Sequence, residues 1–153
     1  MILRAAALAA CAATLAACDV RAPEPYALRP DDREVLDVGR KVYAQHCAAC
    51  HGAHRQGQVP NWRERDPAGR LPAPPHDASG HTWHHPDEVL LRITKFGVAK
   101  AANLPDYDSA MPAYEGVLTD AEIVAVLSWI KSQWPPDVRR RHDEVNAAAR
   151  SAR

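Results

Sequence analysis

The chain has few cysteines, no excess of charge of either sign and no long apolar run. Its 153 residues include only 4 cysteines, and its 19 basic side chains balance 19 acidic ones. This balance gives no electrostatic reason to expect a nucleic-acid partner. The apolar run within residues 5–17 is shorter than the about 20 residues that span a bilayer. Strand-like alternation and internal repeats are also missing, so the sequence predicts an all-α protein.

Two of the cysteines lie in the sequence Cys47-Ala48-Ala49-Cys50-His51. This is the attachment pattern of a c-type haem, in which each thiol adds to one vinyl group and the next residue lies under the iron. We therefore expect Cys47 and Cys50 to hold one covalent haem c and His51 to be its proximal ligand. A thioredoxin-like pair would need a surrounding βαβ pattern, which is missing. A zinc site would need a further pair of ligands, which later histidines could supply.

The start of the chain has the pattern of an export signal. Arg4 precedes a short run of alanine and leucine, which predicts a signal peptide over residues 1–17. The run ends in Leu15-Ala16-Ala17-Cys18, which resembles a bacterial lipobox, so Cys18 is the predicted lipid-carrying first residue. Ordinary signal cleavage nearby is the alternative. Residues 18–30 contain three prolines and predict a tether to the membrane.

The first helix is predicted to begin near Asp31, with Glu34 completing a capping arrangement. Its apolar positions lead directly into the haem motif, and Gly39 lies among them. A glycine costs roughly 1 kcal/mol in a helix interior relative to alanine. We therefore expect Gly39 to allow close approach of another helix.

The partner for that approach is predicted after the capping box of Thr119 and Glu122, in a helix that Pro135-Pro136 ends. A third, shorter helix is predicted from Pro86 to a cap at Gly97. Residues 137–153 read as a charged flexible tail.

Residues 52–85 contain several prolines and little periodicity, which predicts a long loop wrapped around the haem. This loop is also rich in histidine. A copper or zinc site is one interpretation of these histidines, and helix capping, pairing with haem propionates or exposure to solvent is the other. The cluster comprises His76, His81, His84 and His85.

Met111 is the only methionine besides Met1, which leaves with the signal peptide. It lies in a loop before the capped helix and is followed by Pro112. A lone methionine usually fills a gap in a core. In a chain that carries haem, this context predicts instead that Met111 is the second axial ligand of the iron, opposite His51.

The combined pattern resembles the class I monohaem cytochromes c of bacteria, over residues 31–136. The matching residues are Gly39, Tyr43, Cys47, Cys50, His51, Gly52, Met111, Pro112 and Trp129. The resemblance implies the all-α cytochrome c fold, with about three helices and long loops around one covalent haem. In this family a loop proline accepts the second ring N–H of the proximal histidine, and Pro60 is the expected residue. Trp83 is expected to donate its indole N–H to a haem propionate.

The expected function is electron transfer, in which no covalent bond of a substrate is made or broken, between redox proteins on the periplasmic side of a membrane. The protein is expected to act as a lipid-anchored carrier or as a subunit of a larger oxidoreductase. One alternative is a haem enzyme or sensor with an open distal site for peroxide or a diatomic gas. The other is a metal-binding lipoprotein that acts through the histidine-rich insert. Met111 distinguishes the carrier from the haem enzyme or sensor, because a filled sixth coordination position of the iron favours a carrier.

Overall fold

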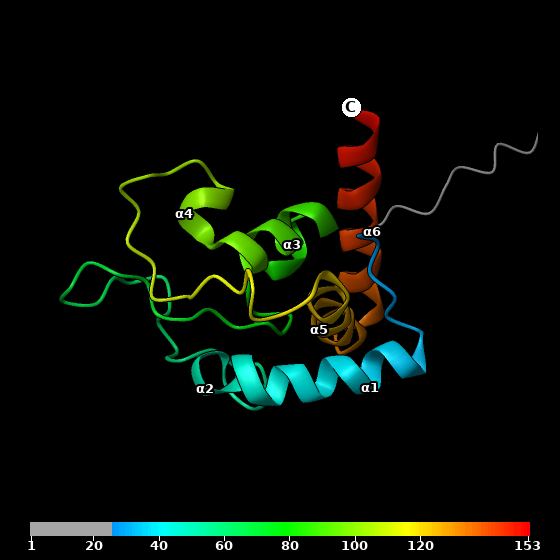
Figure 1. Ribbon diagram of the computed structural model, residues 1–153, viewed down its shortest axis with the longest axis horizontal. Coiled ribbons are helices and arrows are strands. Elements are labelled where there is room, and N and C mark those ends of the chain that lie inside the picture. The colour runs from blue at the N-terminus through cyan, green and yellow to red at the C-terminus, as the bar shows by residue number, and fades with distance from the viewer. Residues whose placement is uncertain (1–25) are drawn as a thin grey trace, which may run out of the picture.

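The computed structural model describes residues 26–153, and over this range it contains helices and loops but no strand. Figure 1 shows the arrangement. The elements are α1 (Arg33–Val42), the π-helical turn η1 (Tyr43–Cys47), α2 (Ala48–His51), the 3-10 turn η2 (Thr82–His84), α3 (Asp87–Phe96), α4 (Val98–Ala101), α5 (Asp120–Ser132) and α6 (Pro136–Ser151). The all-α prediction is confirmed, and α1, α3 and α5 are the three helices that the sequence predicted.

The predicted signal peptide (residues 1–17) and Cys18 lie outside the described residues. Among the helices of residues 26–153, none combines the length and the apolar character that crossing a membrane requires.

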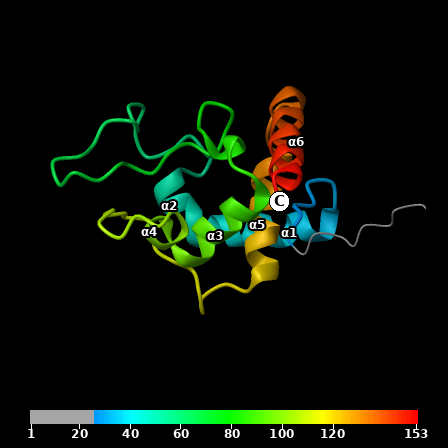
Figure 2. The ribbon, with the colours of Figure 1, turned by 90° about the horizontal axis from the view of Figure 1, so that it is seen from above.

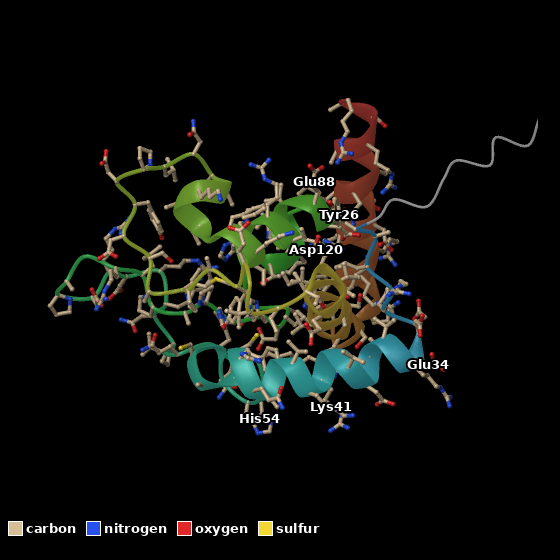
Figure 3. All side chains as sticks on the ribbon, viewed as in Figure 1. Tyr26, Glu34, Lys41, His54, Glu88 and Asp120 are labelled. Carbon is tan, nitrogen blue, oxygen red and sulfur yellow. The ribbon has the colours of Figure 1, made fainter. Side chains whose placement is uncertain are left out.

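Helices α1 and α5 cross, as Figure 1 shows with α5 viewed almost end-on above α1, and Gly39 lies at the crossing. A Cβ atom on Gly39 would lie 2.0 Å from the carbonyl oxygen of Ala125 and 2.8 Å from Cβ of Trp129. Only glycine permits backbones to approach this closely. The expected close approach at Gly39 is therefore confirmed. Glu34, Lys41 and His54 lie on the opposite side, facing away from α5 (Figure 3).

The helix starts are largely those that the sequence predicted. Thr119 and Glu122 form the complete capping box of α5. For α1, the capping residue is Asp32, whose carboxylate accepts a hydrogen bond from the backbone N–H of Val35, and the prediction of Asp31 is wrong by one residue. Asp31 instead accepts a hydrogen bond from Arg139 of α6 at 2.8 Å.

Helix α5 is the centre of the core. Its side chains are buried on nearly every side, and Ile123 and Ser128 are completely inaccessible. Figure 2 shows the reason: α1, α3 and α6 surround it. A helix surrounded in this way needs apolar or internally satisfied side chains all round. Ser128 meets this need by donating to the carbonyl of Val124 at 2.6 Å and accepting from the N–H of Arg29 at 2.8 Å.

The prediction of a flexible tail over residues 137–153 is wrong, because residues 136–151 form helix α6. Pro136 occupies the first turn of this helix, where its missing N–H costs nothing. The same two prolines that end α5 therefore also begin α6. Val138, His142 and Asn146 recur four residues apart and are buried against the rest of the fold. This stripe is short and two-thirds polar, so hydrophobic periodicity alone did not identify it.

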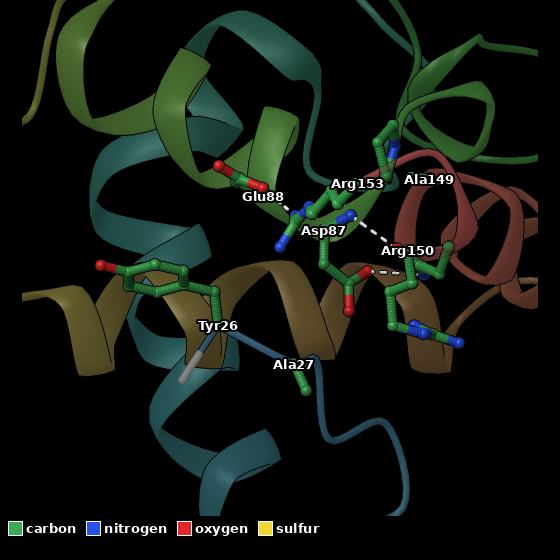
Figure 4. A pocket seen from close by; sticks show the side chains of 9 residues that line it. Tyr26, Ala27, Asp87, Glu88, Ala149, Arg150 and Arg153 are labelled. Carbon is green, nitrogen blue, oxygen red and sulfur yellow. Dashed lines mark hydrogen bonds and ion pairs between the residues drawn. The ribbon is translucent and has the colours of Figure 1, made fainter. Parts of the chain in front are cut away.

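The end of the predicted tether is also part of the domain. Leu28 is buried, and its N–H donates to the carboxylate of Asp87 at 2.9 Å. A small hollow beside this contact lies between residues 26–27, the start of α3 and the end of α6 (Figure 4). The boundary predicted at residue 31 is therefore wrong, and the folded domain begins by Leu28.

Candidate functional site

The C-x-x-C-H segment lies where α1 passes into η1 and α2. Cys47 ends η1 and is half-buried, Cys50 in α2 is exposed, and both thiols are free. His51 ends α2 and is buried, with 7% of its surface exposed. The three predicted haem-binding side chains therefore lie within about two helical turns of one another.

A π-helical turn positions this segment. In η1 the N–H of Ala48 bonds to the carbonyl of Tyr43, which makes the turn one residue wider than an α-helical one. The Tyr43 hydroxyl donates to the carbonyl of Gly52 at 2.9 Å, and its ring packs on Trp129 with centroids 4.7 Å apart. Tyr43 thus ties the end of the haem segment to the crossing of α1 and α5.

The imidazole of His51 has one nitrogen occupied and one available. Its Nδ1 lies 2.8 Å from the carbonyl oxygen of Pro74, so this nitrogen donates its proton there. Burial lowers the pKa of His51, with the Pro74 hydrogen bond opposing the shift, and the ring is therefore neutral at pH 7. A neutral imidazole with a fixed tautomer is the form that binds a metal through Nε2.

Pro74, rather than Pro60, accepts this hydrogen bond, so the prediction for Pro60 is wrong. Pro60 is exposed in the loop. The interaction uses a backbone carbonyl, which every residue of the loop possesses. For this reason the sequence pattern could indicate that a loop proline takes the role but not which one. The path of the chain decides it, because the N–H of Gly57 bonds to the carbonyl of His51 and the N–H of Gln58 to that of Ala73.

The two thiols differ in environment. Burial, followed by the neighbouring Cys50, raises the pKa of Cys47 to about 11. Cys47 is therefore a protonated thiol before it reacts. Two free thiols at this spacing followed by a neutral imidazole fit the covalent attachment of haem c.

Met111 lies in the loop between α4 and α5 and is half-buried. It packs against the core cluster, as do Cys47, Ala48 and Trp129. The adjoining Tyr114 is buried, and its hydroxyl donates to the carbonyl of His46 in η1 at 2.6 Å. This bond fastens the methionine-bearing loop to the haem segment.

Trp83 also packs against the core cluster. Its indole N–H points to the carbonyl of Ala78 at 3.4 Å, and its ring lies on that of His84. The expected donation to a propionate stays a prediction.

The histidines of residues 76–85 pack mainly against other aromatic rings, and the ring centroids of His81 and His85 lie 5.4 Å apart. The ring of His76 stacks on that of His51. The ring of His81 stacks on that of Trp62 with centroids 5.2 Å apart, and the ring of His84 lies on that of Trp83 with centroids 3.6 Å apart. In the part of the chain that the structure describes, no group of three or more His, Cys, Asp or Glu side chains could hold a metal ion. Aromatic packing, rather than a copper or zinc site, accounts for the geometry of these three rings.

Comparison with known proteins agrees with this site. The family model for cytochrome c matches residues 36–134, which include most of α1, the C-x-x-C-H segment, Met111 and α5. Searches of curated proteins and of solved structures gave no significant match. Members of the matching family bind haem c covalently and transfer electrons. The chain belongs to the cytochrome c family.

Proposed function

We propose that this haem c protein is a class I monohaem cytochrome that carries single electrons, with His51 and Met111 as the axial ligands of the iron. The observation that carries the proposal is the bond between Nδ1 of His51 and the carbonyl of Pro74. It fixes the tautomer whose free Nε2 can bind iron, directly beside two free thiols.

The haem supplies the one-electron couple of its iron, and the chain controls how that couple behaves. His51 donates one proton to Pro74, which raises the basicity of the remaining nitrogen. A thioether at the sixth position gives a higher reduction potential than a second histidine does. Buried Tyr43 and the half-buried Trp129 that packs on it limit the access of water to the proximal side. Because neither ligand has to leave, one electron enters or departs with little rearrangement.

Methionine ligation has a direct spectroscopic test. The ferric wild-type protein should show the weak far-red absorption band of an iron–thioether bond, and Met111→Ala should abolish it. Leu104→Ala is the matched control, because Leu104 lies in the same inter-helix loop and is exposed. A band that persists in Met111→Ala, or a bis-histidine spectrum in the wild type, would contradict the assignment.

Covalent attachment has a separate test. A denaturing gel stained for haem should show the group on the wild-type chain. Single replacement of Cys47 or Cys50 by Ala should leave attachment through one thioether, and the double replacement should remove it. Complete loss of haem from the wild type in acid acetone would refute covalent binding.

We place the carrier outside the cytoplasm, on the periplasmic side of a membrane, anchored through lipid on Cys18. The support is the sequence: Arg4, the apolar run over residues 5–17 and the lipobox-like Leu15-Ala16-Ala17-Cys18. Asp19 directly after this cysteine resembles an inner-membrane retention signal of enterobacterial lipoproteins. Each methylene of a buried acyl chain contributes about 0.8 kcal/mol, so several chains hold a protein firmly. Redox proteins at this membrane surface are the proposed donor and acceptor.

The anchor is tested by fractionation and mass spectrometry of the mature protein. The wild type should partition with membranes and detergent, and Cys18→Ser should release it or block its processing. Cys11→Ser is the control, because Cys11 lies inside the predicted signal peptide and should have no effect. A wild-type protein found wholly in the soluble fraction, with another N-terminus, would refute anchoring and leave a diffusing carrier.

A further inference from the structure

The ring of His76 lies face to face with that of His51. The two centroids are 3.9 Å apart and the planes differ by 23°. The Tyr43 ring is also near, with its centroid 6.3 Å from that of His76 and an interplanar angle of 70°. His76 therefore packs against both the proximal histidine and the tyrosine that fastens the haem segment.

His76 is itself held at three points. Its Nδ1 lies 2.8 Å from the hydroxyl of Thr82, which is buried. Its backbone N–H donates to the carbonyl of Arg55 at 2.8 Å. Its backbone carbonyl accepts from the indole N–H of Trp134 at 2.8 Å. Neither the side chain nor the backbone can shift without losing one of these bonds.

The stacked geometry excludes a metal shared by the two rings. An imidazole binds a metal in the plane of its ring, through a nitrogen lone pair. The planes of His51 and His76 are nearly parallel, so their lone pairs do not converge on one ion. His76 therefore acts on His51 through the face of the ring.

We infer that His76 is a positioning residue, which fixes the rotation of the His51 ring about the bond between its Nε2 and the haem iron. The Pro74 hydrogen bond restrains His51 within its own plane, and the stacked ring opposes tilting out of that plane. This inference rests on the proposed ligation of the iron by His51.

The consequence is electronic. In a ferric low-spin haem, the plane of the proximal imidazole contributes, together with the orientation of the second axial ligand, to selecting the iron d orbital that holds the unpaired electron. That choice determines how the unpaired spin is distributed over the porphyrin. A fixed ring plane therefore gives one defined pattern of spin, and a freed ring gives a different or a mixed pattern.

The test uses the haem-loaded ferric protein, with haem methyl shifts from NMR and g values from EPR as readouts. His76→Ala should change the order or spread of the methyl shifts and the g values, while haem remains attached. His76→Phe retains a flat ring and should return the pattern toward the wild type. Thr82→Val keeps the shape of the threonine, removes its hydroxyl and should shift the pattern in the same direction as His76→Ala, by less.

Val138→Ala provides the structural control. Val138 is buried in α6 and has no polar or aromatic group with which to hold His51 or His76, so its truncation should lower stability and leave the spin pattern unchanged. Wild-type spectra in both His76→Ala and Thr82→Val would overturn the inference, as would an equal change in Val138→Ala. If His76→Ala does not fold, Thr82→Val and His76→Phe decide the question. A wild-type spectrum without a histidine-ligated low-spin iron would refute the ligation itself, a different result from unchanged variants.

Discussion

Adding a side chain at Gly39 should destabilise the protein, because it would force α1 and α5 apart. A Cβ atom there would lie 2.0 Å from the oxygen and 2.6 Å from the carbon of the Ala125 carbonyl. Ordinary van der Waals contact begins at 3.4 Å, so the helices would have to separate by more than 1 Å. The nearest atoms belong to the backbone of Ala125, which cannot rotate out of the way as the end of a flexible side chain can.

Two effects of opposite sign set the magnitude. Replacing a helical glycine with alanine gains about 1 kcal/mol in helix propensity. Overpacking costs about 1–3 kcal/mol, and contact with backbone places Gly39 at the upper end of that range. We therefore expect Gly39→Ala to lose about 1–2 kcal/mol of unfolding free energy net. Gly39→Val adds two further methyl groups to that Cβ atom and should lose about 3 kcal/mol or more of unfolding free energy.

Urea denaturation of the haem-loaded protein measures this loss. With a slope of about 2 kcal/mol per molar, a loss of 2 kcal/mol lowers the midpoint by about 1 M. Arg40→Val is the control, because Arg40 is the next residue of α1, is exposed, and receives the same branched side chain. An unchanged midpoint for Gly39→Ala, at an unchanged slope, would refute the argument that the crossing depends on this glycine.

Three further predictions concern groups that hold the helices and the loops together. Tyr114→Phe removes the donor to the His46 carbonyl and should cost about 1 kcal/mol in urea denaturation; no change would show that water replaces the hydroxyl. Burial, and then the charge of Lys131, lowers the pKa of His142, so unfolding takes up a proton as the pH falls below 6.5. Stability should therefore decrease with falling pH, by at most about 1.4 kcal/mol per pH unit from this group, and His142→Asn should reduce that slope; an unaltered slope would refute the assignment. The side chain of Lys131 is buried and its ammonium pairs with Asp143. Asp143→Ala leaves this buried charge unpaired and should cost about 1–3 kcal/mol of unfolding free energy, while Lys131→Met removes the charge and should be nearly neutral. Equal losses in the two variants would contradict this.

The fold was largely predictable where a local rule governs it. The capping box at Thr119 and the helix end at Gly97 each follow from chemistry within a few residues, and a glycine on the apolar face of a helix indicates where another helix approaches. The C-x-x-C-H spacing likewise belongs to one segment. A single sequence contains this information in full.

The remaining features depend on contacts between distant residues. The carbonyl of Pro74 meets His51 only because of the path of the loop, and His76 stacks there for the same reason. Helix α6 was missed because His142 and Asn146 are polar. Their burial is explained by partners elsewhere in the chain: His142 donates to the carbonyl of His85, and Asn146 donates to the carboxylate of Asp87. No local pattern contains such partners.

The last part of the chain holds the loop that supports His51. The indole N–H of Trp134 donates to the backbone carbonyl of His76. The ring of His142 donates to the backbone carbonyl of His85. A ribosome makes the chain from its N-terminus, so the two haem-binding cysteines exist before either of these donors. Until residue 142 has been made, the loop has only its internal bonds, such as those from His51 to Pro74 and from Gln58 to Ala73, and lacks these two. The two thiols and the local bonds around His51 therefore belong to one part of the chain, and the last two supports of this loop come from the C-terminal part.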